Sequence, residues 1–566
     1  MKHLNASWRS PWQWLAVGIM AVHVRGLFID VMEVDAAQYA SIAMEMLQSG
    51  QWLQVQHRGA DYLDKPPLLF WLSALSFAIF GLSNWAYKLP SLLAALLGVW
   101  STYRFALLYY SPSVARHAAV ILATSLGLIL MTNDVRTDTL LLGFSTFAVW
   151  QLAAFAKTHR WHHWLLGFIA VGLAMLAKGP IGLVMPAFAV GSHMLLRNKV
   201  RQLLRWEWLA GLLIIGIILA PMCWGLWVQF DLHPEKWVNG RQGVSGLRFF
   251  FWEQSFGRIT GENPWKNDAS AFFFIHVYLW AFLPWSLLLP WALVRRGISL
   301  WRVRHLSSNH VWPEYYSLGG FVLTFIALSL SQYKLPHYIF ITLPWAAVLV
   351  AAALRQGSDA LLRWLTGIGA VVSILLGWVM VFWVFPESSY LMKLLLMGST
   401  LLWGLATWRW AVRLNAKRAV LLGGAAACIL GLALNFHFYP HLLSYQYTRR
   451  AVETARKIGF RAQDIVFFRV NHHSLDFYNG RILPRYDDPT DLLARVTQRN
   501  ALGVITTPEG RVILEQAGAY VKQAVTLKHF HVAMLNGHFL NPTTRERVLQ
   551  MFYLLIVEPS NSELKE

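Results

Sequence analysis

The amino-acid sequence predicts a polytopic α-helical membrane protein with a small α/β domain at its C-terminal end. Of the 566 residues, 56% are hydrophobic and only 14% are charged, against about 25% charged residues in an ordinary soluble protein. Long apolar runs follow one another up to residue 438, and shorter apolar segments with turn signals follow from residue 440. This composition excludes a soluble enzyme, a disordered chain and a collagen-like chain.

Charge and cysteine content exclude two further classes. The net charge of +20 is typical of membrane proteins, whose short inner loops collect basic residues, so nucleic-acid binding is a poor interpretation. Cys223 and Cys428 both lie inside apolar runs, which argues against a disulfide framework. No removable signal peptide is evident, because 11–29 is too long and too rich in tryptophan, and it is predicted as the first span.

Thirteen segments are predicted to cross the membrane. They are 11–29, 86–110, 117–133, 139–156, 164–177, 180–196, 208–229, 272–294, 314–330, 338–354, 364–385, 390–411 and 419–438. The apolar run 66–81 has only 16 residues, fewer than the ~20 that a spanning helix needs. If it does not span, the inner segments carry 20 Lys or Arg and three acids, as the positive-inside rule expects. The run is therefore predicted to lie in the interface, with the N-terminus inside and the C-terminus outside.

The segments outside the spans divide the chain into two predicted domains. Residues 1–439 form the membrane module, with a first outer loop of about 30–85 and a large outer loop of about 230–271. Residues 440–566 form an α/β domain on the outer face. Its predicted strands are 464–470 and 503–507, and its predicted helices are 448–458 and 489–499.

Charged residues at the outer face are the candidate functional groups, because charges beside membrane segments are functional candidates by default. Residues 31–50 have the spacing of an amphipathic helix that starts near Asp35. Asp35 is interpreted either as a catalytic group or as the cap of this helix. Asp138 opens the fourth span, where it serves either the reaction or the helix, capping it and pairing with Arg136. Lys65 precedes a Pro-Pro step at headgroup depth, where it binds either a lipid phosphate or headgroups in general.

Seven motifs in one order resemble the bacterial branch of the protein O-mannosyltransferase superfamily, whose best-known bacterial members are the lipid A aminoarabinose transferases. The resemblance runs from about residue 30 to residue 355 and is weaker beyond. The motifs are VDAAQYASIAMEMLQSGQW, DYLDKPPLLFWLSALSFAIFG, YKLPSLLAALLG, RTDTLLLGF, LAKGPIGLVMP, FFWEQSFGRITGENP and SQYKLPHYIFITLPWAAVL.

This resemblance implies a fold, a reaction and site residues. The fold is of the GT-C type, and the reaction is transfer of a sugar from a polyprenyl-phosphate donor to an envelope acceptor at the outer face of the bacterial inner membrane. Asp35 matches the family's acidic residue proposed as the base, and Asp138 matches its second acid. Lys65 matches the lysine that meets the lipid phosphate. Further donor-phosphate contacts are assigned to Arg258, Lys334 and Tyr338.

The sequence departs from many relatives at three positions. Ala36 and Gln38 stand where relatives have Glu and Arg, so one phosphate donor is missing. Asp64 stands where they have Glu, which makes Asp64 the candidate for a divalent metal and leaves a metal role open. No His/Cys cluster has metal-ligand spacing, and no other cofactor is implied.

The sequence alone leaves open the acceptor and two other classes of function. Lipid A, another glycan, a lipid and a protein are all compatible acceptors. In the C-terminal domain the segment 472–480 is the most site-like loop, although a purely structural turn is the favoured interpretation. The rival functions are a transporter or flippase of lipid-linked sugars and a non-catalytic assembly subunit. The acids Asp35 and Asp138, together with outer cations and spans nearly free of acids, favour the transferase.

Overall fold

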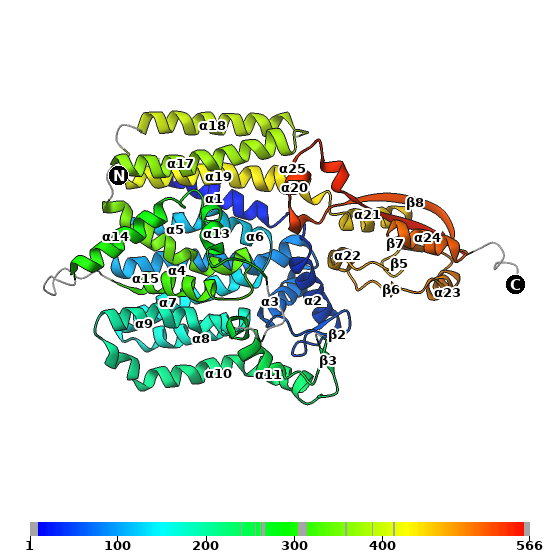
Figure 1. Ribbon diagram of the computed structural model, residues 1–566, viewed down its shortest axis with the longest axis horizontal. Helices are drawn as coiled ribbons and strands as arrows, with labels where there is room; N and C mark the ends of the chain where they lie inside the picture. Colours follow the sequence, from blue (N-terminus) through cyan, green and yellow to red (C-terminus); the bar gives the residue numbers. More distant parts are fainter. Residues whose placement is uncertain are drawn as a thin grey trace, which may run out of the picture.

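The computed structural model describes residues 10–238, 240–254, 256–260, 262, 267–303, 314–356, 359–387, 389–410 and 414–559. Most of these residues are helical, and the helices lie side by side in a bundle that runs horizontally in Figure 1. One end of the bundle carries an α/β unit formed by the last part of the chain, drawn in orange and red in Figure 1. This end is called the outer end below.

The bundle helices coincide with the predicted spans, and two of those spans are broken into helix pairs. Short 3₁₀- or π-helical turns extend several of the bundle helices. These turns are η1 (Val200–Leu204), η2 (Trp227–Asp231), η5 (Pro336–Thr342), η6 (Leu354–Gln356), η7 (Val379–Val384) and η9 (Leu434–Phe438). The helices are α1 (Pro11–Gly26), α4 (Asn84–Tyr109), α5 (Pro112–Ala123), α6 (Leu126–Asn133), α7 (Thr137–Thr158), α8 (Trp161–Lys178), α9 (Ile181–Leu196), α10 (Trp206–Leu226), α13 (Phe273–Ala281), α14 (Leu288–Val303), α15 (Tyr316–Ser329), α16 (Leu343–Ala353), α17 (Asp359–Trp378), α18 (Tyr390–Trp410) and α19 (Ala416–Ala433).

The chain is a multi-pass membrane protein by the length and composition of these helices. Among the described residues, seven helices are long and apolar enough to cross a membrane, or eight if α5 and α6, which meet at a 50° bend, form one span. Three shorter apolar helices are α3 (Leu68–Phe80), α9 and α15. The count of 13 spans stays a prediction.

The first outer loop packs onto the outer end of the bundle. Its elements are α2 (Asp35–Ser49), the hairpin of β1 (Gln56–His57) and β2 (Ala60–Asp61), and α3. With 13 residues at 1.5 Å each, α3 is about 20 Å long, less than the ~30 Å hydrocarbon core. It lies beside α2 at the outer end (Figure 1), and the rings of Tyr39 and Phe70 are 5.7 Å apart. The interfacial position of this segment stays a prediction with which its length agrees.

The second outer loop contains less regular secondary structure than the first. It contains β3 (Trp237–Val238), β4 (Arg241–Gln242), α11 (Gly246–Arg248), the π-helical turn η3 (Phe249–Glu253) and α12 (Gly257–Thr260). Lys236 pairs with Asp61 at 2.8 Å, and the amide of Gln229 donates to the same carboxylate at 2.8 Å. The two outer loops are therefore tied together at β2.

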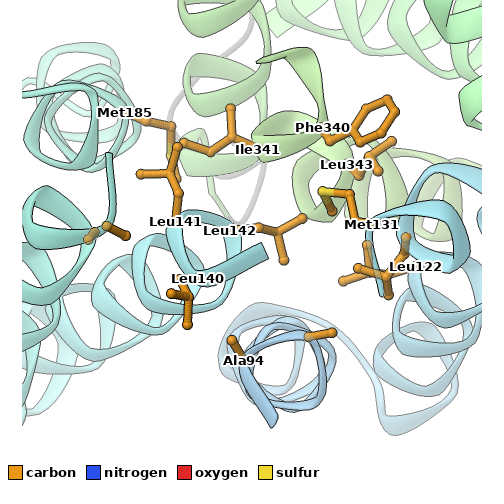
Figure 2. Packing of buried hydrophobic residues seen from close by; sticks show 14 of the residues in the cluster. Ala94, Leu122, Met131, Leu140, Leu141, Leu142, Met185, Phe340, Ile341 and Leu343 are labelled. Carbon is orange, nitrogen blue, oxygen red and sulfur yellow. The ribbon is translucent and has the colours of Figure 1, made fainter. Parts of the chain in front are cut away.

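The core of the bundle surrounds the start of α7. Leu140, Leu141 and Leu142 are at most 2% exposed and lie among side chains of neighbouring helices, including Ala94 of α4 and Ile341 of η5 (Figure 2). At Gly143 an added Cβ would lie 2.3 Å from the main-chain oxygen of Ala94, so α4 and α7 cross with no room for a side chain. This close packing fixes the outer end of α7, where Asp138 lies.

The α/β unit contains a five-stranded mixed sheet in the order β6-β5-β7-β9-β8, in which β6, β5 and β7 are parallel and β9 is antiparallel to both of its neighbours. β5 and β7 coincide with the two predicted strands, and α21 and α23 with the two predicted helices. The elements are α20 (Tyr439–Leu443), α21 (Thr448–Ile458), β5 (Ile465–Phe468), α22 (His473–Asn479), β6 (Arg485–Tyr486), α23 (Pro489–Arg499), β7 (Leu502–Thr506), α24 (Pro508–Gln516), β8 (Tyr520–His529), η10 (Val532–Met534), α25 (Gly537–Leu540), η11 (Arg545–Val548) and β9 (Gln550–Glu558).

The short helix α22 joins this unit to the bundle. It ends at Gly480, whose φ of 78° is the left-handed conformation that closes a helix at low cost for glycine. The main-chain oxygen of Gly480 accepts a hydrogen bond from Gln48 of α2 at 2.8 Å. The ring of Phe477 packs 5.9 Å from Phe77 of α3. α22 therefore rests on both helices of the first outer loop.

Candidate active site

Asp35 is the first helical residue of α2, and it does not cap the helix. The capping position is Val34, and no side-chain cap bond forms there. The carboxylate of Asp35 instead pairs with the guanidinium of Arg136, and 40% of its side chain remains exposed. The alternative interpretation of Asp35 as a helix cap is therefore wrong, and its carboxylate is accessible at the outer end of the bundle.

Arg136 lies between two carboxylates in the turn that connects α6 to α7. Its Nε donates to Asp134 at 2.9 Å, and its Nη1 donates to Asp35. Burial opposes the charge of Arg136, but Asp134 and Asp35 outweigh burial, so the pKa of the guanidinium is raised above its ordinary value. Arg136 is therefore a fixed cation that holds Asp35 in place. The sequence offered a pair between Arg136 and Asp138 as one of two alternatives, and the structure pairs Arg136 with Asp134 and Asp35 instead.

Asp138 lies in the first turn of α7 and is only 2% exposed. Its partner is Lys178, the last residue of α8, whose ammonium donates to Oδ1. Nε2 of His337 lies 3.8 Å from Oδ2. The ammonium of Lys178 also lies 4.1 Å from the ring centre of Tyr338. Asp138 is therefore the buried anion of a cluster that also contains Lys178, His337 and Tyr338.

Tyr39 is a buried tyrosine whose pKa responds to both acids. Its side chain is 3% exposed, and burial raises its pKa well above the ordinary value. The charges of Asp35 and Asp138 raise the pKa further, while Arg136 lowers it. Because the pKa of one buried phenol responds to all three groups, Asp35, Arg136 and Asp138 belong to one electrostatic neighbourhood.

A cavity of about 130 Å³ opens beside this cluster. Two of its lining side chains, Lys65 and Lys178, are cationic, and most of the others are apolar. Tyr338, which the sequence assigned to the donor site, lines the same cavity. The lining residues are Lys65, Leu141, Lys178, Pro180, Ile181, Val184, Gln254, Phe256, Ala327, Leu328, Ser331 and Tyr338. A pocket whose lining combines two cations with mostly apolar side chains suits an anionic headgroup on an apolar chain.

Two other predicted site residues contribute no described side chain to this cavity. Lys334 is 7% exposed, and its ammonium donates to the main-chain oxygen of Ala269 at 2.9 Å. Its main chain exchanges two hydrogen bonds with Asn267. Lys334 therefore fastens a loop and does not line the cavity. Arg258 belongs to α12, but its side chain lies outside the described residues.

Asp64 contributes its main chain to this region, because its carbonyl oxygen accepts a hydrogen bond from the amide of Gln254. Gln254 in turn lines the cavity. Among the described residues, no group of three or more His, Cys, Asp or Glu side chains could hold a metal ion. Around Asp64, too, the described residues form no such group.

The loop 472–480, which the sequence singled out in the C-terminal domain, faces the first outer loop. The ring of His473 lies 4.8 Å from that of His57. Burial lowers the pKa of His473 to about 4 and that of His57 to about 3, so both imidazoles are neutral at pH 7. The charge of Asp35 partly offsets this shift at His473. The loop thus lies within electrostatic reach of Asp35, which its sequence did not indicate.

The same loop is anchored by a buried ion pair. Asp476 of α22 is fully buried and pairs with Arg58 of the first outer loop. Arg58 also donates to the main-chain oxygen of Leu483 at 2.7 Å. Burial raises the pKa of Asp476 to about 6, although Arg58 opposes that rise. The contact between the α/β unit and the loop that carries Asp35 is therefore polar and specific.

Comparisons with known proteins agree with this architecture. The family model of the dolichyl-phosphate-mannose-protein mannosyltransferases matches residues 64–224. ArnT from Cupriavidus metallidurans in the apo state superposes with a TM-score of 0.70 at 17% identity, covering 90% of this chain and 96% of that chain. The fold is that of ArnT. The structure of the same ArnT bound to undecaprenyl phosphate matches with a TM-score of 0.69 at 18% identity.

Curated relatives extend the ArnT similarity to the sequence. The undecaprenyl phosphate-alpha-4-amino-4-deoxy-L-arabinose arabinosyl transferase 1 of Pseudomonas fluorescens is 28% identical over 364 residues, which are 62% of this chain and 58% of that protein. The corresponding transferase of Pseudomonas aeruginosa is 28% identical over 395 residues, 67% of this chain and 68% of that protein. The chain spans about three fifths of the length of the first relatives that it matches. The predicted resemblance is confirmed as a similarity: the chain resembles the lipid A aminoarabinose transferases in sequence and has the fold of ArnT.

Sequence reasoning found part of this site. Lys65 and Tyr338 line the cavity together, and Asp35 and Asp138 lie in one electrostatic neighbourhood. Lys178 was not assigned to the site, and its pairing with Asp138 was missed. The signal that could have found it is a lysine at the outer end of one span opposite an acid at the outer end of the span before it.

Proposed function

We propose that this chain is a glycosyltransferase that moves a sugar from a polyprenyl-phosphate donor to an envelope acceptor on the periplasmic face of the bacterial inner membrane. The observation that carries the proposal is the cavity whose lining combines Lys65 and Lys178 with apolar side chains, and the accessible carboxylate of Asp35 adds to it. The cavity suits the lipid phosphate that leaves, and the carboxylate of Asp35 suits an acceptor that loses a proton.

The cavity supports a lipid-phosphate donor. Ile181 and Val184 of α9 and Leu328 of α15 give the prenyl chain an apolar path. The ammonium groups of Lys65 and Lys178 stabilise the phosphate, whose negative charge increases as the bond to the sugar breaks. Asp138 keeps Lys178 in place, and the ring of Tyr338 limits where its ammonium can move.

The acceptor reacts near Asp35. Its hydroxyl or amine attacks the anomeric carbon, Asp35 accepts the proton, and the bond between the anomeric carbon and the phosphate oxygen breaks. A single displacement of this kind inverts the anomeric centre. Arg136 fixes the carboxylate of Asp35 through a charge-assisted hydrogen bond. No nucleotide takes part in this step.

The names of the relatives suggest the substrates. The curated transferases are named for undecaprenyl phosphate-4-amino-4-deoxy-L-arabinose, and we infer an undecaprenyl-phosphate amino sugar as the donor here. Lipid A is the first acceptor to test, followed by other glycans and by envelope proteins. Mass spectrometry of lipid A, glycolipids and envelope proteins from a deletion strain identifies the acceptor.

Purified protein and a lipid-linked sugar test the proposal directly. Polyprenyl phosphate should be released only when an acceptor is present, and Asp35→Asn should abolish the release while its level in the membrane stays normal. Asp61→Asn is the matched control, because Asp61 is an acid of the same loop that pairs with Lys236 at 2.8 Å. A donor that crosses the bilayer with its glycosidic bond intact would instead identify a transporter, and full activity of Asp35→Asn would reject the base.

A further inference from the structure

The stretch that leads into α2 has no regular secondary structure of its own. Residues 29–34 lie between α1 and α2 and form neither a helix nor a strand. Ile29 and Val31 are about 2% exposed or less, and Glu33 is 7% exposed. Buried main-chain groups must find hydrogen-bond partners, so the chain just before Asp35 depends on other parts of the protein.

The α/β unit supplies these partners. The N–H of Val31 donates to the hydroxyl oxygen of Tyr478 at 2.8 Å, and the oxygen of Val31 accepts from the amide of Gln446 at 2.8 Å. The N–H of Glu33 donates to the side-chain oxygen of Gln446 at 2.8 Å. Gln446 therefore pairs with this stretch in the way that a neighbouring strand would.

The side chain of Glu33 points into the same contact. Its Oε1 accepts the main-chain N–H of Ser474 at 2.7 Å and the hydroxyl of Ser474 at 2.5 Å. Ser474 is fully buried at the start of α22, and its hydroxyl lies 2.8 Å from that of Thr448. A buried carboxyl held by two donors from one residue has little freedom.

We propose that Glu33 is a positioning residue for Asp35, and that Ser474 and Gln446 of the α/β unit hold it. Asp35 follows Glu33 by two residues, at the point where α2 begins. Its carboxylate must face both Arg136 and the acceptor, and a displacement of about 1 Å from the reacting geometry can cost two orders of magnitude in rate. The α/β unit thus completes the active site without touching the reacting atoms. This inference rests on the proposed function.

The contact is specific to the start of α2, which provides a matched control. Gln48, near the other end of the same helix, also reaches the α/β unit, because its amide donates to the main-chain oxygen of Gly480 at 2.8 Å. Removal of this exposed hydrogen bond weakens the junction but leaves the hydrogen bonds of residues 31–33 intact. A residue that only stabilises the junction should therefore behave like Gln48.

Steady-state kinetics on four variants of the full-length protein test the inference. Glu33→Ala and Ser474→Ala should lower kcat by about ten- to a hundredfold and leave the KM for the lipid-linked donor unchanged, because the cavity at Lys65 is not altered. Glu33→Gln keeps an oxygen that accepts both hydrogen bonds and should retain most of the activity. Gln48→Ala should have the kcat of the wild type. Membrane levels and unfolding temperatures are measured for every variant.

Three results would overturn the positioning role. These are wild-type kcat in Glu33→Ala and Ser474→Ala, an equal loss of kcat in Gln48→Ala, or a loss of kcat in Glu33→Gln as large as in Glu33→Ala. If the alanine variants do not accumulate in the membrane, kcat is compared between Glu33→Gln and Ser474→Thr, which keeps the hydroxyl. Loss of activity in Glu33→Gln would then reject the positioning role. Failure of the proposed function is separate, since it would show as activity in Asp35→Asn.

Discussion

Replacement of Lys178 by methionine separates the two roles assigned to this lysine. The substitution keeps a long apolar side chain and removes the ammonium, which leaves the carboxylate of Asp138 buried without its partner. Removing one member of a buried ion pair costs about 3–5 kcal/mol. Asp138 is 2% and Lys178 15% exposed, and His337 at 3.8 Å remains as a distant substitute, so we expect a loss of about 3 kcal/mol, at the lower end of that range.

The double variant Asp138→Leu/Lys178→Met removes both charges and should recover most of this stability, because a buried pair is often replaceable by apolar residues. Both the single and the double variant should remain less active than the wild type, since each removes one cation from the phosphate site. A contact to a charged group is worth about 1.5–3 kcal/mol, which predicts a KM for the donor raised by at least tenfold.

Thermal unfolding in detergent and donor-release kinetics measure the two effects. Wild-type stability of Lys178→Met would refute the reasoning about the buried pair. Wild-type donor use by the double variant would show that Lys178 serves the fold alone, and the phosphate site would then have to be sought nearer Lys65.

Three other predictions concern single positions. Lys65→Ala should weaken donor use by about ten- to a hundredfold in donor titrations, while Lys65→Arg keeps part of it because the charge persists; equal donor use by Lys65→Ala would make Lys65 an interface anchor. A cysteine at Ser83, after Cys223 and Cys428 are replaced, should react with an impermeant thiol reagent from outside, and labelling only from inside would overturn the predicted topology. Burial raises the pKa of Glu33 to about 7 from about 4.5, so the folded chain binds this proton more tightly than the unfolded chain. Its contribution to stability is complete below pH 4.5 and is lost as the pH rises through about 7. Unfolding at a series of pH values should show this decline in the wild type and a smaller one in Glu33→Gln; identical profiles would contradict the assignment.

Local sequence patterns predicted the bundle well because each helix carries its own signal. Hydropathy marked every bundle helix, and the short run 66–81 was recognised by its length, which the structure gives as 13 helical residues in α3. The charge pattern marked the outer end as the chemical face. These features depend on composition within a few turns of helix, which a single sequence contains in full.

Pairings across the fold were beyond the same reasoning. Lys178 and Asp138 are 40 residues apart, and Arg136 and Asp35 are 101 residues apart, so no local pattern connects them. The sequence therefore paired Arg136 with its neighbour Asp138. Lys334 was assigned to the phosphate for a similar reason, since its motif could not show that the ammonium bonds to the main chain at Ala269.

The α/β unit was predicted in outline but not in its role. The strands β8 and β9 were not predicted, because each mixes exposed and buried positions. By contrast, β5 and β7 are buried throughout. The segment around Ser474 was interpreted as a structural turn. Ser474 does have a structural role, because it donates two hydrogen bonds to Glu33. Glu33 precedes Asp35 by only two residues, and neither fact can be predicted from the segment around Ser474 alone.

The hydrogen bonds between Val31 or Glu33 and residues 446–478 set an order of events during synthesis. The partners of this stretch are more than 400 positions away in the chain, beyond the last membrane helix, α19. A growing chain therefore inserts every bundle helix before the groups that pair with residues 31–33 have been made. Until then the stretch before α2 lacks these hydrogen bonds, and the carboxylate of Asp35 is held through Arg136 without the support of the α/β unit. An incomplete chain would thus lie in the membrane with an unfinished site, which would be completed only when the last part of the chain has emerged and docked.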